Sequence, residues 1–134
     1  MKETPKLGTV LLVEDETFIS VLVAEALADE GYKVHSVANA EEALRDLEAG
    51  LKVDILFTDI NLPGMDGAAL AEKVRARYPD LPVIYASGRW ILLDALRALP
   101  RSAVLPKPYS LTRACAAVGM LLSVARPADA TVAG

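Results

Sequence analysis

Cysteine is nearly absent from this sequence, since Cys115 is the single one among 134 residues. An internal disulfide is therefore excluded, and a reducing compartment such as the cytoplasm is expected. Lysine and arginine form no dense run, and the net charge is −4. Because a nucleic-acid-binding surface normally carries a basic stripe, direct binding of nucleic acid is not expected.

Long hydrophobic runs are missing as well. A membrane-spanning helix needs about 20 consecutive apolar residues, and every apolar stretch of this sequence is far shorter. The first residues, 1–8, are polar and lack the apolar centre of a signal peptide. The sequence therefore predicts a cytoplasmic protein that does not bind a membrane.

The residues that are present suit one globular domain. Apolar residues make up 53% of the sequence and charged residues 24%, a normal balance for a protein with a well-filled core. The length leaves little room for a second domain. We expect an N-terminal extension over residues 1–8, a folded domain over residues 9–125 and a flexible tail over residues 126–134, where alanine and other small residues dominate.

Strand-like segments alternate with helical patterns five times along the chain. The strands are expected at residues 9–13, 32–37, 53–58, 81–86 and 103–105. The helices are expected at residues 17–29, 40–48, 68–78, 90–99 and 111–124. Asn39 and Ser110 stand where caps of the second and fifth helices belong. Repeated strand–helix units favour parallel pairing with right-handed crossovers. The predicted fold class is therefore α/β, a five-stranded doubly wound parallel sheet in a (βα)5 flavodoxin-like three-layer sandwich.

Polar side chains stand where the predicted strands end. Glu14 and Asp15 follow the first strand, Asp59 the third, Ser87 the fourth and Lys107 the fifth. The carboxyl ends of the strands form the ligand-binding edge of such a sheet, so we expect these side chains to meet there. Three carboxylates in one place repel one another unless a cation lies among them. Because oxygen ligands favour a hard ion, the pattern predicts Mg²⁺ or Mn²⁺.

Asp59 is the candidate nucleophile of this edge. It ends the central strand, between the acidic pair and the lysine. A carboxylate can form an acyl phosphate in covalent catalysis. Lys107 can neutralise charge on a transferred phosphoryl group, and Ser87 can donate a hydrogen bond to it. The residues therefore predict a phosphoryl-transfer site.

Four motifs give the sequence a resemblance to a known family. They read V-L-L-V-E-D-E, L-F-T-D-I-N-L-P-G-M-D-G, Y-A-S-G and L-P-K-P-Y, and each lies at the end of a predicted strand. Together and in this order they resemble the response-regulator receiver domains of two-component signalling, the CheY-like superfamily. The likeness runs from Thr9 to Val124. It implies a phosphoacceptor switch that catalyses only its own phosphorylation and dephosphorylation, and not an enzyme with a separate substrate.

The resemblance also implies a role for each residue of the motifs. Asp59 would take a phosphoryl group from the phosphohistidine of a histidine kinase or histidine phosphotransfer protein. Asp15 and Asp59 would bind the metal directly, Asn61 through its backbone carbonyl and Glu14 through a water molecule. The output would be a contact with a downstream protein or self-association.

The phosphoryl group itself would be held by two further residues. The resemblance gives Ser87 the place of the switch serine or threonine and Lys107 that of the family's lysine. It also implies that the peptide bond between Lys107 and Pro108 is cis, a conformation that X-Pro bonds adopt at little cost.

The sequence departs from the family pattern on the last predicted strand. Many receivers carry Tyr or Phe three residues before the lysine, and here that residue is Val104. In this the sequence resembles a subfamily with an F-A-T-G-like motif and no aromatic residue on strand five. We therefore expect the signal to leave through the loop after Ser87, with Tyr85 or Trp90 reporting it.

Other interpretations compete with this one. Acidic residues at Glu14–Glu16 can simply complement a helix dipole, Ser87 can cap the next helix, and Asp66–Gly67 is expected to be a turn. A haloacid-dehalogenase-type phosphatase would need a second aspartate where Asn61 stands. A pseudo-receiver that is never phosphorylated would not need the complete set of acidic pair, acceptor, serine and lysine.

Overall fold

The computed structural model describes residues 7–124, apart from the side chains of 90–92 and 124. Its strands are β1 (Thr9–Val13), β2 (Lys33–Val37), β3 (Ile55–Asp59), β4 (Val83–Ser87) and β5 (Ser102–Pro106). Its helices are α1 (Thr17–Glu30), α2 (Ala40–Glu48), α3 (Gly67–Arg77), α4 (Trp90–Arg97) and α5 (Leu111–Val124). Most of the predicted extension and the whole predicted tail lie outside the described residues. Within the described range, no helix is long and apolar enough to cross a membrane.

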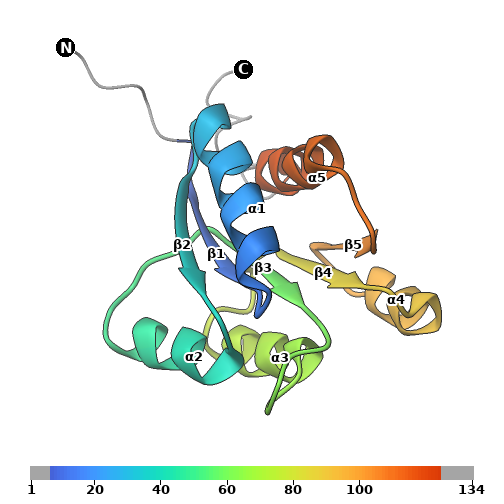
Figure 1. Ribbon diagram of the computed structural model, residues 1–134. Coiled ribbons are helices and arrows are strands. Elements are labelled where there is room, and N and C mark those ends of the chain that lie inside the picture. The colour runs from blue at the N-terminus through green and yellow to red at the C-terminus, as the bar shows by residue number, and fades with distance from the viewer. Residues whose placement is uncertain (1–6, 125–134) are drawn as a thin grey trace.

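The five strands form one parallel sheet in the order β2-β1-β3-β4-β5. The chain runs from β1 outward to β2, then crosses β1 and continues in the other direction through β3, β4 and β5 (Figure 1). The direction therefore reverses at the carboxyl ends of β1 and β3, which is the position where doubly wound sheets bind ligands. The predicted fold class is confirmed.

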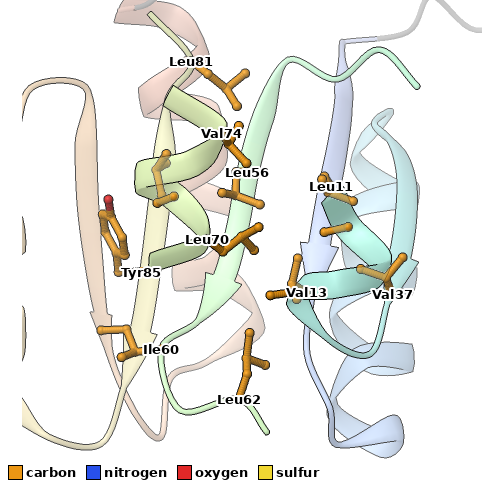
Figure 2. Packing of buried hydrophobic residues seen from close by; sticks show 14 of the residues in the cluster. Leu11, Val13, Val37, Leu56, Ile60, Leu62, Leu70, Val74, Leu81 and Tyr85 are labelled. Carbon is orange, nitrogen blue, oxygen red and sulfur yellow. The ribbon is translucent and has the colours of Figure 1, made fainter. Parts of the chain in front are cut away.

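Helices cover both faces of the sheet, and alternate residues of the strands face the two layers. One hydrophobic core unites α2, α3 and α4 with the sheet and contains Leu11, Leu56 and Tyr85 (Figure 2). The other unites α1 and α5 with the opposite face and contains Leu12 and Phe57. Because both faces are covered, β1, β3 and β4 are buried along almost their whole length, as their apolar sequences predict.

The element boundaries follow local chemistry. The first strand and the second and fifth helices have the predicted bounds. Asn39 caps α2 by accepting a hydrogen bond from the backbone N–H of Glu42 (2.8 Å), and the Ser110 hydroxyl accepts one from Arg113 at the start of α5 (3.0 Å). The fourth strand begins two residues later than predicted, at Val83, because Pro82 has no N–H to donate to a ladder.

Candidate functional site

Three carboxylates meet at the carboxyl edge of the sheet. Glu14 and Asp15 directly follow β1, and Asp59 is the last residue of the neighbouring strand β3. One oxygen atom from each of these three side chains lies within 4.8 Å of the other two. Glu14 and Asp59 are buried, with 4% and 6% of their surface exposed, whereas Asp15 is open to solvent. Buried like charges in one place are costly unless a cation neutralises them, so these residues fit a divalent metal ion.

Lys107 supplies the positive charge of the site. It follows β5, and its Nζ lies 2.9 Å from Oδ2 of Asp59 and 3.6 Å from Oε1 of Glu14. Its backbone N–H donates a hydrogen bond to the carbonyl of Ser87 (2.9 Å), which fixes the lysine beside the end of β4. The peptide bond between Lys107 and Pro108 is cis, as the resemblance implies.

Ser87 ends β4 at the same edge and is fully buried. Its hydroxyl accepts a hydrogen bond from the backbone N–H of Arg89 (3.0 Å), so it is directed toward the loop before α4. The alternative interpretation of Ser87 as the cap of the next helix is wrong, because the N-cap residue of α4 is Arg89 and no side chain caps that helix. The hydroxyl bonds the N-cap residue itself, one step before the helix.

The charges of the site perturb one another. Burial raises the pKa of Asp59, although the hydrogen bond and charge of Lys107 oppose this increase. Burial likewise raises the pKa of Glu14, against the hydrogen bond that its carboxylate accepts from the backbone of Glu16 (3.0 Å). Burial alone would lower the pKa of Lys107, but the hydrogen bond and charge of Asp59 and the charge of Glu14 outweigh it and raise the pKa. Negative charge is thus in excess, which favours a cation.

The remaining predicted residues occupy different surroundings. Asn61 lies exposed in the loop after β3, and its backbone N–H donates a hydrogen bond to the Asp59 carboxylate. Tyr85 is buried on β4 beside Val104 of β5, its partner in the sheet register. Trp90 begins α4, but its side chain lies outside the described part of the structure. The metal-binding role of Asn61 and the likeness to the F-A-T-G subfamily stay predictions.

Two residues to which the sequence analysis gave no part in the site, Thr58 and Gly67, position Asp59. The Thr58 hydroxyl donates a hydrogen bond to the Asp59 carbonyl (2.9 Å). A Cβ atom on Gly67 would lie 2.1 Å from the same carbonyl oxygen, so α3 can begin there only with glycine. The expected turn at Asp66–Gly67 is wrong, because Asp66 caps α3 through the N–H of Ala69 and Gly67 is the first helical residue. A D-G pair is equally typical of a turn and of the start of a helix. Only the folded structure shows that Gly67 lies against the carbonyl of Asp59.

Addition of Mg²⁺ should stabilise the protein. Because the folded-state pKa values of Asp59 and Glu14 are raised, the metal-free fold holds more protons than the unfolded chain and loses stability as the pH rises through them. At neutral pH a metal at ten times its Kd should therefore add about 1.4 kcal/mol to the free energy of unfolding. Urea unfolding with and without Mg²⁺ measures this increase in the free energy of unfolding. Asp15→Asn should reduce the increase. Asp29→Asn, on the exposed side of α1, is the control and should retain it. An equal gain in both variants would place the ion elsewhere.

Comparisons with known proteins agree with this geometry. The family model for the response regulator receiver domain matches residues 10–119. The chain is 41% identical over 120 residues to sensor kinase CckA of Brucella abortus, over 86% of this chain and 12% of that protein. It is 36% identical over 118 residues to the DNA-binding transcriptional regulator NtrC of Escherichia coli, over 87% of this chain and 25% of that protein.

Among solved structures, a response regulator receiver protein from Sinorhizobium medicae WSM419 gives a TM-score of 0.80 at 31% identity, over 87% of this chain and 95% of that one. The chain therefore covers 95% of the solved receiver chain but only 12% and 25% of the lengths of the two curated relatives. The chain belongs to the response regulator receiver domain family of two-component signalling.

Proposed function

We propose that Asp59 is the phosphoacceptor of this receiver domain and that the acidic cluster holds the divalent ion that phosphorylation requires. The observation that carries the proposal is the position of the Asp59 carboxylate. It lies 2.9 Å from the Lys107 ammonium and within 4.8 Å of carboxylate oxygens of Glu14 and Asp15. A nucleophile between a fixed cation and a metal-binding cluster is the arrangement that phosphoryl transfer needs.

The transfer itself needs one nucleophilic step. An oxygen of the Asp59 carboxylate attacks the phosphorus of a phosphohistidine, forming the new P–O bond while the P–N bond to the imidazole breaks. The electron pair of that bond stays on the imidazole nitrogen. Lys107 is placed to neutralise charge on the transferred oxygens. A bound Mg²⁺ or Mn²⁺ would supply further charge neutralisation, held by Asp15 and Asp59, with Glu14 acting through water and Asn61 through its backbone carbonyl.

Ser87 connects the modified aspartate to a conformational change. Its hydroxyl is committed to the backbone of Arg89 in this structure. A phosphoryl group on Asp59 offers a charged acceptor, and hydrogen bonds to charged groups are the stronger ones. The hydroxyl accepts from Arg89 through a lone pair and keeps its own proton, which it would donate to a phosphoryl oxygen. Movement of Ser87 toward Asp59 for this purpose would draw on the segment that leads into α4. A ligand that favours one of two conformations in this way shifts their populations.

The partners follow from the chemistry of the donor. A phosphohistidine is carried by a histidine kinase or a histidine phosphotransfer protein, and these are the proposed donors. Because the chain spans a small part of its curated relatives, its output is proposed only as a class: contact with a downstream protein or self-association. Neither nucleic acid nor a membrane is a proposed direct partner, and the proposed location is the cytoplasm.

Incubation with acetyl phosphate and Mg²⁺ tests the proposal. Intact-mass spectrometry should show one added phosphoryl group that EDTA prevents and hydroxylamine removes, because an acyl phosphate is sensitive to that nucleophile. A chain that binds Mg²⁺ but stays unmodified would be a pseudo-receiver. Repeated turnover of p-nitrophenyl phosphate would instead support the phosphatase alternative, which the receiver-family match disfavours.

A further inference from the structure

A groove runs between α2 and α3, on the face of the sheet opposite to α1. Two neighbouring cavities of about 450 and 500 Å³ form it, and they share the lining residues Leu47, Glu48, Arg77 and Tyr78. The smaller cavity extends to Met65, just before α3, and the larger one extends to the amino edge of the sheet. The two cavities therefore form one elongated hollow, which we call the α2–α3 groove.

The α2–α3 groove has an apolar floor and a basic flank. Its floor consists of apolar side chains from both helices and from the adjoining loops: Leu44, Leu47, Leu51, Met65, Val74 and Leu81. Lys73 and Arg77 stand one helical turn apart on its flank, and Lys52 adds a third positive charge. Glu48 and Asp54 are the acidic residues of the lining, and the carboxylate of Asp54 already accepts a backbone hydrogen bond. This lining favours a partner that is apolar and carries negative charge.

The outer face of α1 has the complementary character. Phe18, Val21 and Leu22 are exposed there, and Phe18 has 76% of its surface in contact with solvent. Glu25 and Asp29 continue the same stripe, because residues three and four apart lie on one side of a helix. α1 contains no lysine or arginine. Its outer face is thus apolar over the first two turns and acidic over the last two, and a contiguous exposed apolar patch indicates a contact surface.

The charged residues of the two surfaces have the same spacing. Glu25 and Asp29 are four residues apart on α1, as Lys73 and Arg77 are on α3, and four residues span about 6 Å along a helix. An antiparallel alignment of α1 with α3 therefore brings both acidic residues beside both basic residues. The same alignment carries Phe18, about 10 Å before Glu25, past the end of α3 and over the larger cavity.

We propose that the outer face of α1 in one copy of this chain docks into the α2–α3 groove of a second copy, with Glu25 beside Arg77, Asp29 beside Lys73, and Phe18 in the larger cavity. Within one chain the two surfaces cannot meet, because α1 and α3 cover opposite faces of the sheet. The contact is therefore head-to-tail, and an assembly keeps an unused groove at one end and an unused α1 at the other. It needs no phosphoryl group on Asp59 and stands apart from the proposed function.

Sedimentation equilibrium of the unaltered chain tests the docking. We expect weak association, with a Kd of about 10 μM to 1 mM, because exposed charge pairs contribute little each. As the concentration rises through this range, the average mass should exceed the 14.3 kDa of one chain and continue past twice that value, because head-to-tail contacts do not close. A mass that stays at one chain, or that levels at two, would overturn the proposal.

Charge reversal identifies the two surfaces. Lys73→Glu with Arg77→Glu should weaken self-association by about tenfold or more, because both attractive pairs become repulsive. Glu25→Lys with Asp29→Lys should have the same effect. A mixture of the two double variants should associate again, since each then carries the charges that complement the other. All four residues are exposed, so circular dichroism should show an unchanged fold. A mixture that fails to associate would contradict the pairing of α1 with α3.

The apolar part of the contact has its own control. Phe18→Ser should also weaken self-association by about tenfold, because an exposed aromatic ring then has nothing to bury. Met120→Ser removes a side chain of α5 that is 56% exposed and lies outside both surfaces, and it should leave self-association unchanged. Equal losses in these two variants would place the contact elsewhere. Asp59→Asn should associate like the unaltered chain, so failure of the docking and failure of the proposed function are separate results.

Discussion

Replacement of Asp59 by asparagine is expected to abolish phosphorylation by acetyl phosphate and by any phosphohistidine donor, with a loss of at least about a thousandfold in rate. The asparagine amide has nearly the size of the carboxylate and can still hold Lys107, but it cannot form an acyl phosphate. Incorporation of the phosphoryl group, followed by intact mass, measures the loss. Asp66→Asn is the matched control, because Asp66 caps α3 outside the acidic cluster and should leave incorporation at the level of the unaltered chain.

The same variant should be more stable than the unaltered chain when no metal is present. Burial raises the pKa of Asp59, which means that the ionised carboxylate destabilises the fold at neutral pH. Removing one of three neighbouring negative charges should add on the order of 1 kcal/mol to the free energy of unfolding. A stable but unmodified variant would exclude misfolding as the reason for lost phosphorylation. If Asp59→Asn still incorporated the phosphoryl group, the phosphoacceptor would be Asp15 or Glu14 instead.

The convergence of the site could be predicted because parallel strands share their polarity. Each buried strand is readable as an apolar run, and the residue after each run must reach the same edge of the sheet. Glu14, Asp59 and Lys107 are far apart in the sequence, yet this rule alone brings them together, and the structure places the lysine in contact with both carboxylates. The apolar pattern of the strands and the order of the elements are enough for this prediction.

Contacts that depend on side-chain direction could not be predicted in the same way. The sequence places Tyr85 on a buried strand, but whether its hydroxyl points toward the site or away from it depends on which polar groups lie at each end. Those groups are Ser102 and Arg75, which belong to other elements and approach only after the sheet and α3 have packed. The same holds for the hydrogen bond between Thr58 and the carbonyl of Asp59, since the loop after β3 decides where that carbonyl points.

Replacement of Gly67 by alanine is expected to lower the free energy of unfolding by about 2–3 kcal/mol, the upper part of the range for overpacked interiors. The added Cβ would lie 2.1 Å from the backbone oxygen of Asp59 and 2.9 Å from the Thr58 hydroxyl. Both neighbours belong to β3, the central strand, and a backbone oxygen has no rotamer by which to withdraw. Urea unfolding followed by circular dichroism measures the difference.

Gly88→Ala provides the matched control, because a Cβ on Gly88 meets no atom within 4 Å and its backbone is not in the left-handed region. That variant should stay within about 0.5 kcal/mol of the unaltered chain, as surface substitutions generally do. In Gly67→Ala the collision can be relieved only by moving α3 away from β3 or by moving the carbonyl of Asp59. The second movement displaces the proposed acceptor relative to Lys107, so the folded fraction of this variant should also be phosphorylated more slowly. Equal stability of the two alanine variants would show that α3 begins far enough from Asp59 for glycine to be dispensable.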